Sequence, residues 1–282
     1  MAIPSNVQNA IDNGYEFRLG DYISQGFRLV TKNTGTFIAG ALVFFVIVFA
    51  TSMLSSAVGA MLTLLGGFAG ILLTQIISQV ASAAVTGPML AGFFNASHKT
   101  DAGKSLEFGD FFAGFSKWTP LFITTIMTTV VVLAACIPGI YLMMEAGLNI
   151  FELQGPRAME VWEEVDLGSV GLGALVAFIP AFYLSVSYAW APMLTWFYDI
   201  SGWEALEASR KLAAKNFLPT FGLMVVLGII MVLGVVALCV GILFTFPAYT
   251  AGMYAAFADI FGLNTKDENE GSDFIDHFAP NV

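Results

Sequence analysis

Residues 33–97 read NTGTFIAGALVFFVIVFATSMLSSAVGAMLTLLGGFAGILLTQIISQVASAAVTGPMLAGFFNAS and contain no Asp, Glu, Lys, Arg or His. These 65 residues begin directly after Lys32 and end directly before His98. A helix needs about 20 apolar residues to cross the hydrocarbon core of a bilayer, so the stretch has room for two crossings and a turn. A soluble helix of this length would have to show water a polar face, and this stretch offers no charged one. It predicts two membrane spans, at about residues 36–56 and 66–94.

Three further uncharged stretches extend the pattern, over residues 118–144, 167–198 and 216–258. The chain of 282 residues is 57% hydrophobic and only 11% charged, whereas soluble domains average about 25% charged residues. Long apolar runs also exclude an outer-membrane barrel, whose strands alternate over about ten residues. We therefore predict an all-α polytopic membrane protein with six transmembrane helices. It forms one domain over residues 1–262, followed by an acidic, flexible tail over residues 263–282.

Amphipathic segments precede three of the predicted hairpins or spans, over residues 12–32, 98–117 and 199–216. Each places aromatic and aliphatic side chains at helical spacing with basic residues beside them, as expected of a helix lying in the headgroup plane. For the first segment, an ordinary solvated lead-in is the alternative. The predicted lipid anchors are Phe27, Phe111, Phe115, Trp203 and Phe217, and the predicted headgroup contacts are Arg28, Lys32, Lys117, Arg210 and Lys215.

The basic residues predict how the chain is threaded. With six spans, ten of the 11 Lys and Arg residues fall on the side of the two termini, and Arg157 alone falls on the other. The positive-inside rule then places both termini in the cytoplasm. The chain opens without a basic region followed by an apolar core, so we expect the first span to direct insertion into a bacterial inner (plasma) membrane.

Small and weakly polar residues recur every four positions along the second span. A stripe of this kind lets a neighbouring helix backbone approach closely, and we expect the closest helix packing at Gly66, Gly70, Ser78 and Ser82. A path for a substrate is the alternative interpretation of the same face. That path would use Thr74, Gln75, Ser78 and Gln79.

Residues that carry catalysis or bind cofactors are scarce. The two histidines, His98 and His277, lie in separate polar segments, and no metal-binding, phosphate-binding or nucleophile motif occurs. The two cysteines, Cys136 and Cys239, lie in apolar stretches and predict no redox pair. The acidic loop over residues 145–166 lacks a calcium-loop pattern, so we favour a solvated loop over a divalent-cation site. We expect no catalytic residues, no metal and no cofactor.

The charge of the chain and the predicted spans exclude further partners. A formal net charge of −10 argues against nucleic acid, which needs a basic surface. The predicted spans contain no carboxylate, His, Lys or Arg, which argues against transport coupled to protons or sodium. The expected partners are membrane lipids and further copies of the chain.

Two halves of the chain resemble each other. LVTKN at 29–33 precedes the first predicted span and LAAKN at 212–216 precedes the fifth, while AGFFNA at 91–96 and AGMYAA at 251–256 end the second and sixth. We predict an internal repeat over residues 20–96 and 203–258.

Several segments are similar to one bacterial family. WEALEASRKLAAKN at 203–216, VGILFTFP at 240–247 and AAFAD at 255–259 resemble the YciC-like polytopic proteins, as do FGDFFAGF at 108–115 and PGIY at 138–141. These proteins are similar to the membrane domain of some glycerophosphoryl diester phosphodiesterases. The resemblance concerns the membrane domain alone, so it does not imply the activity of the hydrolase. Within that group the chain also resembles a protein of predatory bacteria, which implies a ring of helical subunits that traps lipid.

Together these observations predict a non-enzymatic membrane protein that forms homo-oligomers, binds or traps lipid and perturbs or remodels the bilayer. A passive transporter or pore for small solutes, using the polar stripe of the second span, is the alternative function.

Overall fold

The computed structural model describes residues 4–148, 165–200, 202–236 and 241–263, without the side chains at 6, 13 and 65–68. Within these ranges the regular secondary structure is helical, as the sequence predicts. The helices are α1 (Ser5–Asn13), α2 (Leu19–Lys32), α3 (Thr34–Asp101), the 3-10 helix η1 (Phe108–Lys117), α4 (Trp118–Glu145), α6 (Leu167–Ser187), α7 (Ala191–Tyr198), α8 (Trp203–Lys215), α9 (Phe217–Val236) and α10 (Ile242–Phe261).

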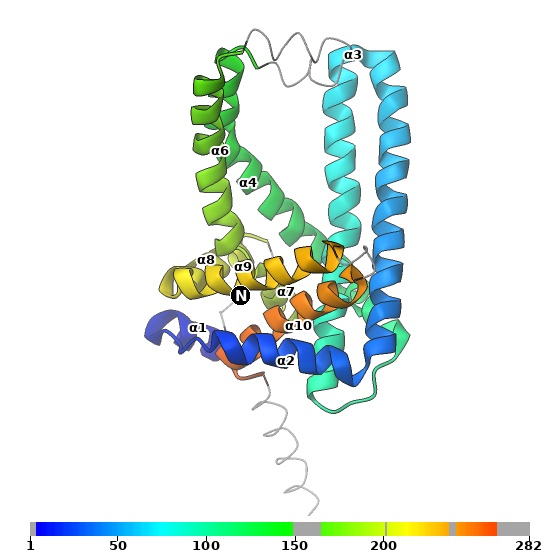
Figure 1. Ribbon diagram of the computed structural model, residues 1–282, viewed down its shortest axis with the longest axis vertical. Helices are drawn as coiled ribbons and strands as arrows, with labels where there is room; N and C mark the ends of the chain where they lie inside the picture. The colour runs from blue at the N-terminus through cyan, green and yellow to red at the C-terminus, as the bar shows by residue number, and fades with distance from the viewer. Residues whose placement is uncertain (1–3, 149–164, 201, 237–240, 264–282) are drawn as a thin grey trace, which may run out of the picture.

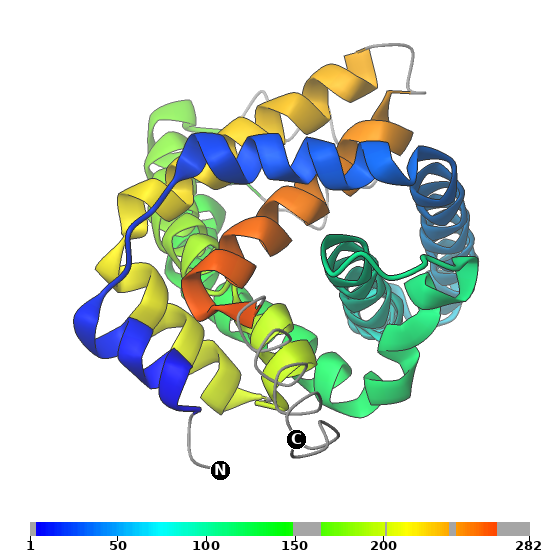
Figure 2. The same cartoon turned by 90° about the horizontal axis from the view of Figure 1, so that it is seen from below.

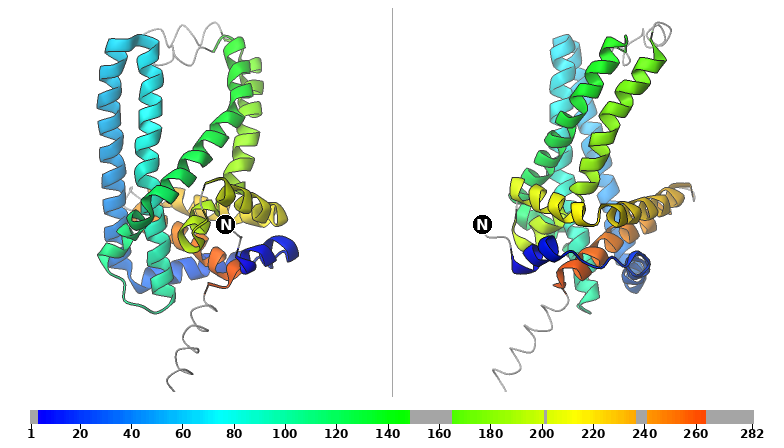
Figure 3. Two further views of the ribbon diagram at one scale, coloured as in Figure 1. Left: turned by 180° about the vertical axis from the view of Figure 1, so that it is seen from behind. Right: turned by 90° about the vertical axis from the view of Figure 1, so that its left-hand side faces the viewer.

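Helix α3 is folded back on itself as an upright hairpin, with one arm at Thr34–Leu64 and the other at Ala69–Asp101 (Figures 1 and 3). Small residues let the arms approach each other. A Cβ atom on Gly70 would lie 2.2 Å from the carbonyl oxygen of Leu62, and one on Gly59 would lie 2.3 Å from the Thr74 side chain. The prediction of two spans in this stretch is confirmed, with longer arms and a shorter turn than expected.

Helices α4 and α6 form the second pair that rises from the base, with α6 upright and α4 slanting from the foot of α3 toward the top of α6 (Figure 1). We refer to them as the second upright pair. They cross where Gly139 faces Gly173 and Ala177, and a Cβ atom on Gly139 would lie 2.3 Å from the amide nitrogen of Ala177. The bounds of α4 agree closely with the third predicted span. The fourth predicted span is divided, because α6 ends at Ser187 and α7 begins at Ala191 with Pro192 in its first turn.

The remaining helices form a base below the two upright pairs. Helices α2, α8, α9 and α10 run crosswise to the arms of α3, and α1 lies beside α8 (Figures 1 and 2). The crosswise orientation of α2 and α8 agrees with two of the predicted in-plane helices. The prediction of one in-plane helix over residues 98–117 is corrected. These residues contain the end of α3, up to Asp101, and η1, a 3-10 helix packed along the lower end of α3.

Helix α10 corrects the prediction of six spans. It lies in the middle of the base, and nearly all of its residues from Phe246 to Phe261 are buried. Its small residues permit this packing, since a Cβ atom on Gly26 of α2 would lie 2.7 Å from the amide nitrogen of Gly252. Helix α10 is therefore a core helix and not a span. Five segments are long and apolar enough to cross a membrane: Thr34–Leu64, Ala69–Asp101, Phe108–Glu145, Leu167–Tyr198 and Phe217–Val236.

Helix α9, the last of these segments, has the composition of a span but not the direction of one. It lies crosswise at the base next to α10, while the two arms of α3 and helix α6 stand upright and α4 slants between them (Figure 1). Large apolar side chains on one side of α9 stay exposed, including Ile229, Val232 and Val236. Composition alone therefore does not determine how a helix is oriented.

Candidate functional site

The predicted lipid anchors fall into three groups in the structure. Trp203 is 57% exposed, and Phe115 is also exposed. Phe27 and Phe217 are half-covered, because their rings lie 6.0 Å from Phe244 and 5.3 Å from Tyr183, respectively, between centroids. The fifth residue, Phe111, behaves differently.

Phe111 is 0% exposed, so lipid does not reach it in this structure. Its ring lies 5.6 Å from that of Phe37 and 4.8 Å from that of Phe93, between centroids. The prediction assumed an α-helix, in which Phe111 and Phe115 share a face. In a 3-10 helix of three residues per turn, positions four apart point in different directions. Phe111 therefore enters the core while Phe115 points outward, and its assignment as a lipid anchor is corrected.

Three of the predicted headgroup contacts have partners within the protein. Lys117 donates to the Asp199 carboxylate at 2.6 Å and to the carbonyl oxygen of Trp196 at 3.0 Å. Lys215 donates to the carbonyl oxygen of Asp12 at 3.3 Å.

Arg210 pairs with Glu207 at 2.8 Å, and its hydrogen bond is the main reason why the pKa of Glu207 is lowered. The two remaining residues, Arg28 and Lys32, are exposed on α2 and form no ion pair with a residue that the structure describes.

A polar cluster at the base was not predicted. Tyr22 of α2 donates to the Asp259 carboxylate of α10 at 2.7 Å, and Arg18 forms an ion pair with the same carboxylate. Burial, followed by this hydrogen bond, raises the pKa of Tyr22 to about 12. A second polar contact joins α3 to α10, where Nδ1 of His98 lies 2.9 Å from the hydroxyl oxygen of Tyr254. These partners are far apart in the sequence, so no local spacing could reveal them.

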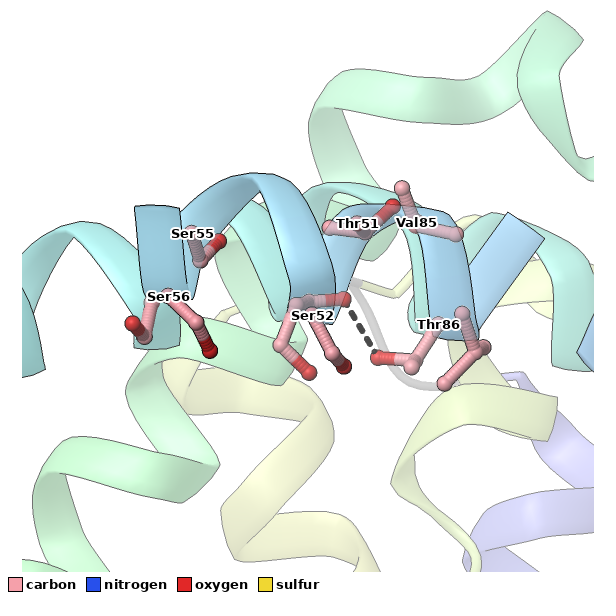
Figure 4. A pocket seen from close by; sticks show the side chains of 9 residues that line it. Thr51, Ser52, Ser55, Ser56, Val85 and Thr86 are labelled. Carbon is pink, nitrogen blue, oxygen red and sulfur yellow. Dashed lines mark hydrogen bonds between the residues drawn. The ribbon is translucent and has the colours of Figure 1, made fainter. Parts of the chain in front are cut away.

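The predicted small-residue stripe lines a pocket between the two arms of α3 (Figure 4). The pocket has a volume of about 190 Å³. Ser78 and Ser82 face it from the second arm, while Gly70 lies further along, where the arms touch. The surroundings of Gly66 lie outside the part that the structure describes. The pocket is lined by Val48, Thr51, Ser52, Ser55, Ser56, Ser78, Ser82, Val85 and Thr86.

A second pocket of about 220 Å³ continues along the same two arms and shares Ser56 and Ser78 with the first. Thr74 and Gln75 line this second pocket, as the predicted substrate path requires. Gln79, the fourth residue of that path, is exposed and lines neither pocket.

Among the residues that the structure describes, the close approaches between the two upright pairs lie in their lower parts. A Cβ atom on Gly87 of α3 would lie 2.6 Å from the Thr125 hydroxyl of α4, and the indole of Trp118 donates to the carbonyl oxygen of Ala84 at 2.9 Å. Above this point the pairs diverge (Figures 1 and 3). Large apolar side chains there are exposed: Phe49, Met53, Leu64, Leu72, Leu73, Ile76, Val130, Leu133, Ile137, Leu172, Leu175 and Phe178.

The base collects the basic residues that the structure describes. All nine lie on or beside α2, the lower end of α3, η1 and α8, while Arg157 and Lys266 lie outside the described residues. The acidic residues between 149 and 164 are also outside them. No group of three or more His, Cys, Asp or Glu side chains that could hold a metal ion occurs in the part searched.

No family model, curated protein or solved structure matches the chain. Its composition and its five long apolar helices make it an integral, polytopic, all-helical membrane protein. The resemblance to the YciC-like family stays a prediction.

Proposed function

We propose that this chain is a non-enzymatic protein of the bacterial inner (plasma) membrane that associates with copies of itself and holds lipid against its upright helices, thereby perturbing the bilayer. One observation carries the proposal: above their contact near Gly87, the two upright pairs leave large apolar side chains exposed. Leu64, for example, is 88% exposed. Surfaces of this kind must be covered by lipid tails or by another protein, because water does not solvate them.

The distribution of charge supports an orientation with both termini in the cytoplasm. The described basic residues gather at the base, and the positive-inside rule assigns such an end to the cytoplasmic leaflet. Arg28 and Lys32 have exposed charges suited to phosphate headgroups at that leaflet. The YciC-like resemblance is compatible with this arrangement and belongs to the proposal.

Native mass spectrometry of the full chain, released gently into a mild detergent, tests the proposal because it reports copy number and retained lipid together. We expect assemblies of several copies with lipid attached. A lipid-free monomer would contradict both parts of the proposal.

A variant pair makes the test specific to the upright helices. Changing Val130 and Ile137 of α4 to Ser should reduce the number of retained lipids or copies. Leu218→Ser, at an exposed position of α9 in the base, serves as the control and should leave the upright surface unchanged. Equal losses in both variants would mean that the upright helices have no special part in lipid retention.

A passive pore is the second candidate, because Thr74, Gln75 and Ser78 line a pocket between the α3 arms. Solute flux into liposomes that falls after Gln75→Leu would favour the pore. Gln79→Leu is a useful comparison, since this side chain lies outside both pockets. Retained lipid without flux would favour the leading proposal.

A further inference from the structure

The pocket between the α3 arms differs from the rest of the upright surface because hydroxyl groups line it. Its threonines are satisfied within their own helix: Thr51 donates to the carbonyl oxygen of Ile47 at 2.8 Å, and Thr86 donates to that of Ser82 at 2.8 Å. The serine hydroxyls of the pocket form no hydrogen bond with any residue that the structure describes. These serines are Ser52, Ser55, Ser56, Ser78 and Ser82. Free donors and acceptors therefore converge on one pocket from two arms (Figure 4).

Ser55 is the informative member of this group. It is only 8% exposed, it lines the pocket, and its hydroxyl has no partner among the described residues. The Ser55 hydroxyl faces the pocket, and a hydroxyl that lacks a hydrogen bond is costly in a bilayer, where no bulk water compensates. The remaining partner is therefore expected to be a molecule in the pocket, which is large enough for several water-sized groups.

The depth of the pocket restricts what that molecule can be. Ser55 lies ten residues before the turn at 65–68 and 21 residues after Thr34, which is about 15 Å and about 30 Å along the arm at 1.5 Å per residue. No charged side chain occurs between residues 33 and 97. A phosphate at this depth would have no cation to balance it, so the ligand must be uncharged.

We propose that the pocket binds the head of an uncharged glyceride of the diacylglycerol class. This inference rests on the proposed function, that the protein holds lipid, and names one lipid that it selects. The free hydroxyl of such a head can donate and accept, and its ester oxygens accept hydrogen bonds from the serines. Its acyl chains then lie along exposed apolar side chains of the first arm, such as Phe49 and Met53.

Photolabelling tests this inference. The full chain is reconstituted in phosphatidylcholine vesicles that contain a small fraction of either a photoactivatable diacylglycerol or a photoactivatable phosphatidylcholine. We expect the diacylglycerol probe to label the arms of α3 preferentially. Changing Ser52, Ser55 and Ser78 together to Ala removes three donors with little change in packing, and should reduce that labelling about tenfold. Labelling by the phosphatidylcholine probe should stay unchanged.

The matched control is Ser185→Ala in α6, whose hydroxyl already donates to the carbonyl oxygen of Ala181 at 2.8 Å. It should leave the diacylglycerol labelling intact. Excess glycerol should not compete. If glycerol does compete, the pocket takes a water-soluble polyol and the glyceride assignment is wrong.

Two further outcomes would overturn the inference while leaving the proposed function intact. One is equal labelling by the two probes, and the other is undiminished labelling of the triple alanine variant, in each case with lipid still retained in native mass spectrometry. A disulfide between two copies of a Ser56→Cys variant would assign the pocket to a second chain and overturn it as well. Loss of all retained lipid from the unmodified protein would instead contradict the proposed function itself.

Discussion

The base and the upright helices contain similar large apolar residues, but these are buried in the base and exposed in the upright helices. In the base, Tyr22, Phe111 and Tyr254 are buried, and polar groups pair between helices. In the upright helices, phenylalanines and leucines of the same size are exposed. The difference teaches that the bilayer takes the place of a protein core in one region and not in the other. The predictions that follow test this contrast.

The largest expected effect comes from removing one aromatic ring in each region. Phe111→Ala should lower the free energy of unfolding by about 3–5 kcal/mol, because it leaves a cavity beside Phe37 and Phe93. Phe178→Ala should cost less than about 1 kcal/mol, because this side chain is 62% exposed and lipid or detergent refills its place. Unfolding of the purified protein by titration with a denaturing detergent measures both. Similar losses of unfolding free energy in the two variants would contradict the difference between the base and the upright helices.

A single methyl group should have the next largest effect. A Cβ atom on Gly92 would lie 1.8 Å from the carbonyl oxygen of Phe111, so Gly92→Ala forces α3 and η1 apart. We expect a loss of about 2–3 kcal/mol in the same assay.

Gly228→Ala in α9 is the matched control, because nothing lies within 4 Å of the added atom. It should be neutral or slightly stabilising, since alanine favours a helix by about 1 kcal/mol over glycine. A stable Gly92→Ala protein would show that the base is looser than its packing indicates.

The hydrogen bond from Tyr22 to Asp259 tests the polar side of the base. Tyr22→Phe should cost about 1 kcal/mol near neutral pH. Folding raises the pKa of the Tyr22 phenol from 10.0 to about 12. The protonated phenol therefore stabilises the folded protein fully below pH 10, and this stabilisation is lost as the pH rises toward 12.

The unmodified protein should accordingly lose stability over that range, and Tyr22→Phe should lose less. Identical alkaline profiles for the unmodified protein and Tyr22→Phe would contradict the assignment.

The smallest expected effect concerns the half-exposed pair between Glu207 and Arg210 on α8. Arg210 lowers the pKa of Glu207. The pair therefore stabilises the folded protein when the pH is above the ordinary pKa of a glutamate, and this stabilisation is lost as the pH falls through the lowered pKa of Glu207. Glu207→Gln should cost about 0.5 kcal/mol at neutral pH and nothing in acid. Glu16→Gln, outside α8, is the control. A pH-independent effect of Glu207→Gln would point to packing and not to charge.

The sequence alone could predict the class of the protein and much of its candidate surface. The uncharged stretch at 33–97 was enough to predict the α3 hairpin, and residues 118–144 predicted α4 within a few positions. Trp203 and Phe115 could be assigned to the surface because their neighbours in the sequence are polar. Phe111 could not be assigned correctly, since its burial depends on a 3-10 helix and on glycines of another element.

The sequence by itself determined that this protein is a membrane protein and that it is helical, because both follow from residues that are close together along the chain. Only the tertiary structure decided that α10 is a core helix, that α9 lies crosswise and that Ser55 is buried in a pocket. The physical reason is that hydropathy measures the preference of a segment for an apolar environment. Whether that environment is lipid or another helix depends on contacts between distant residues.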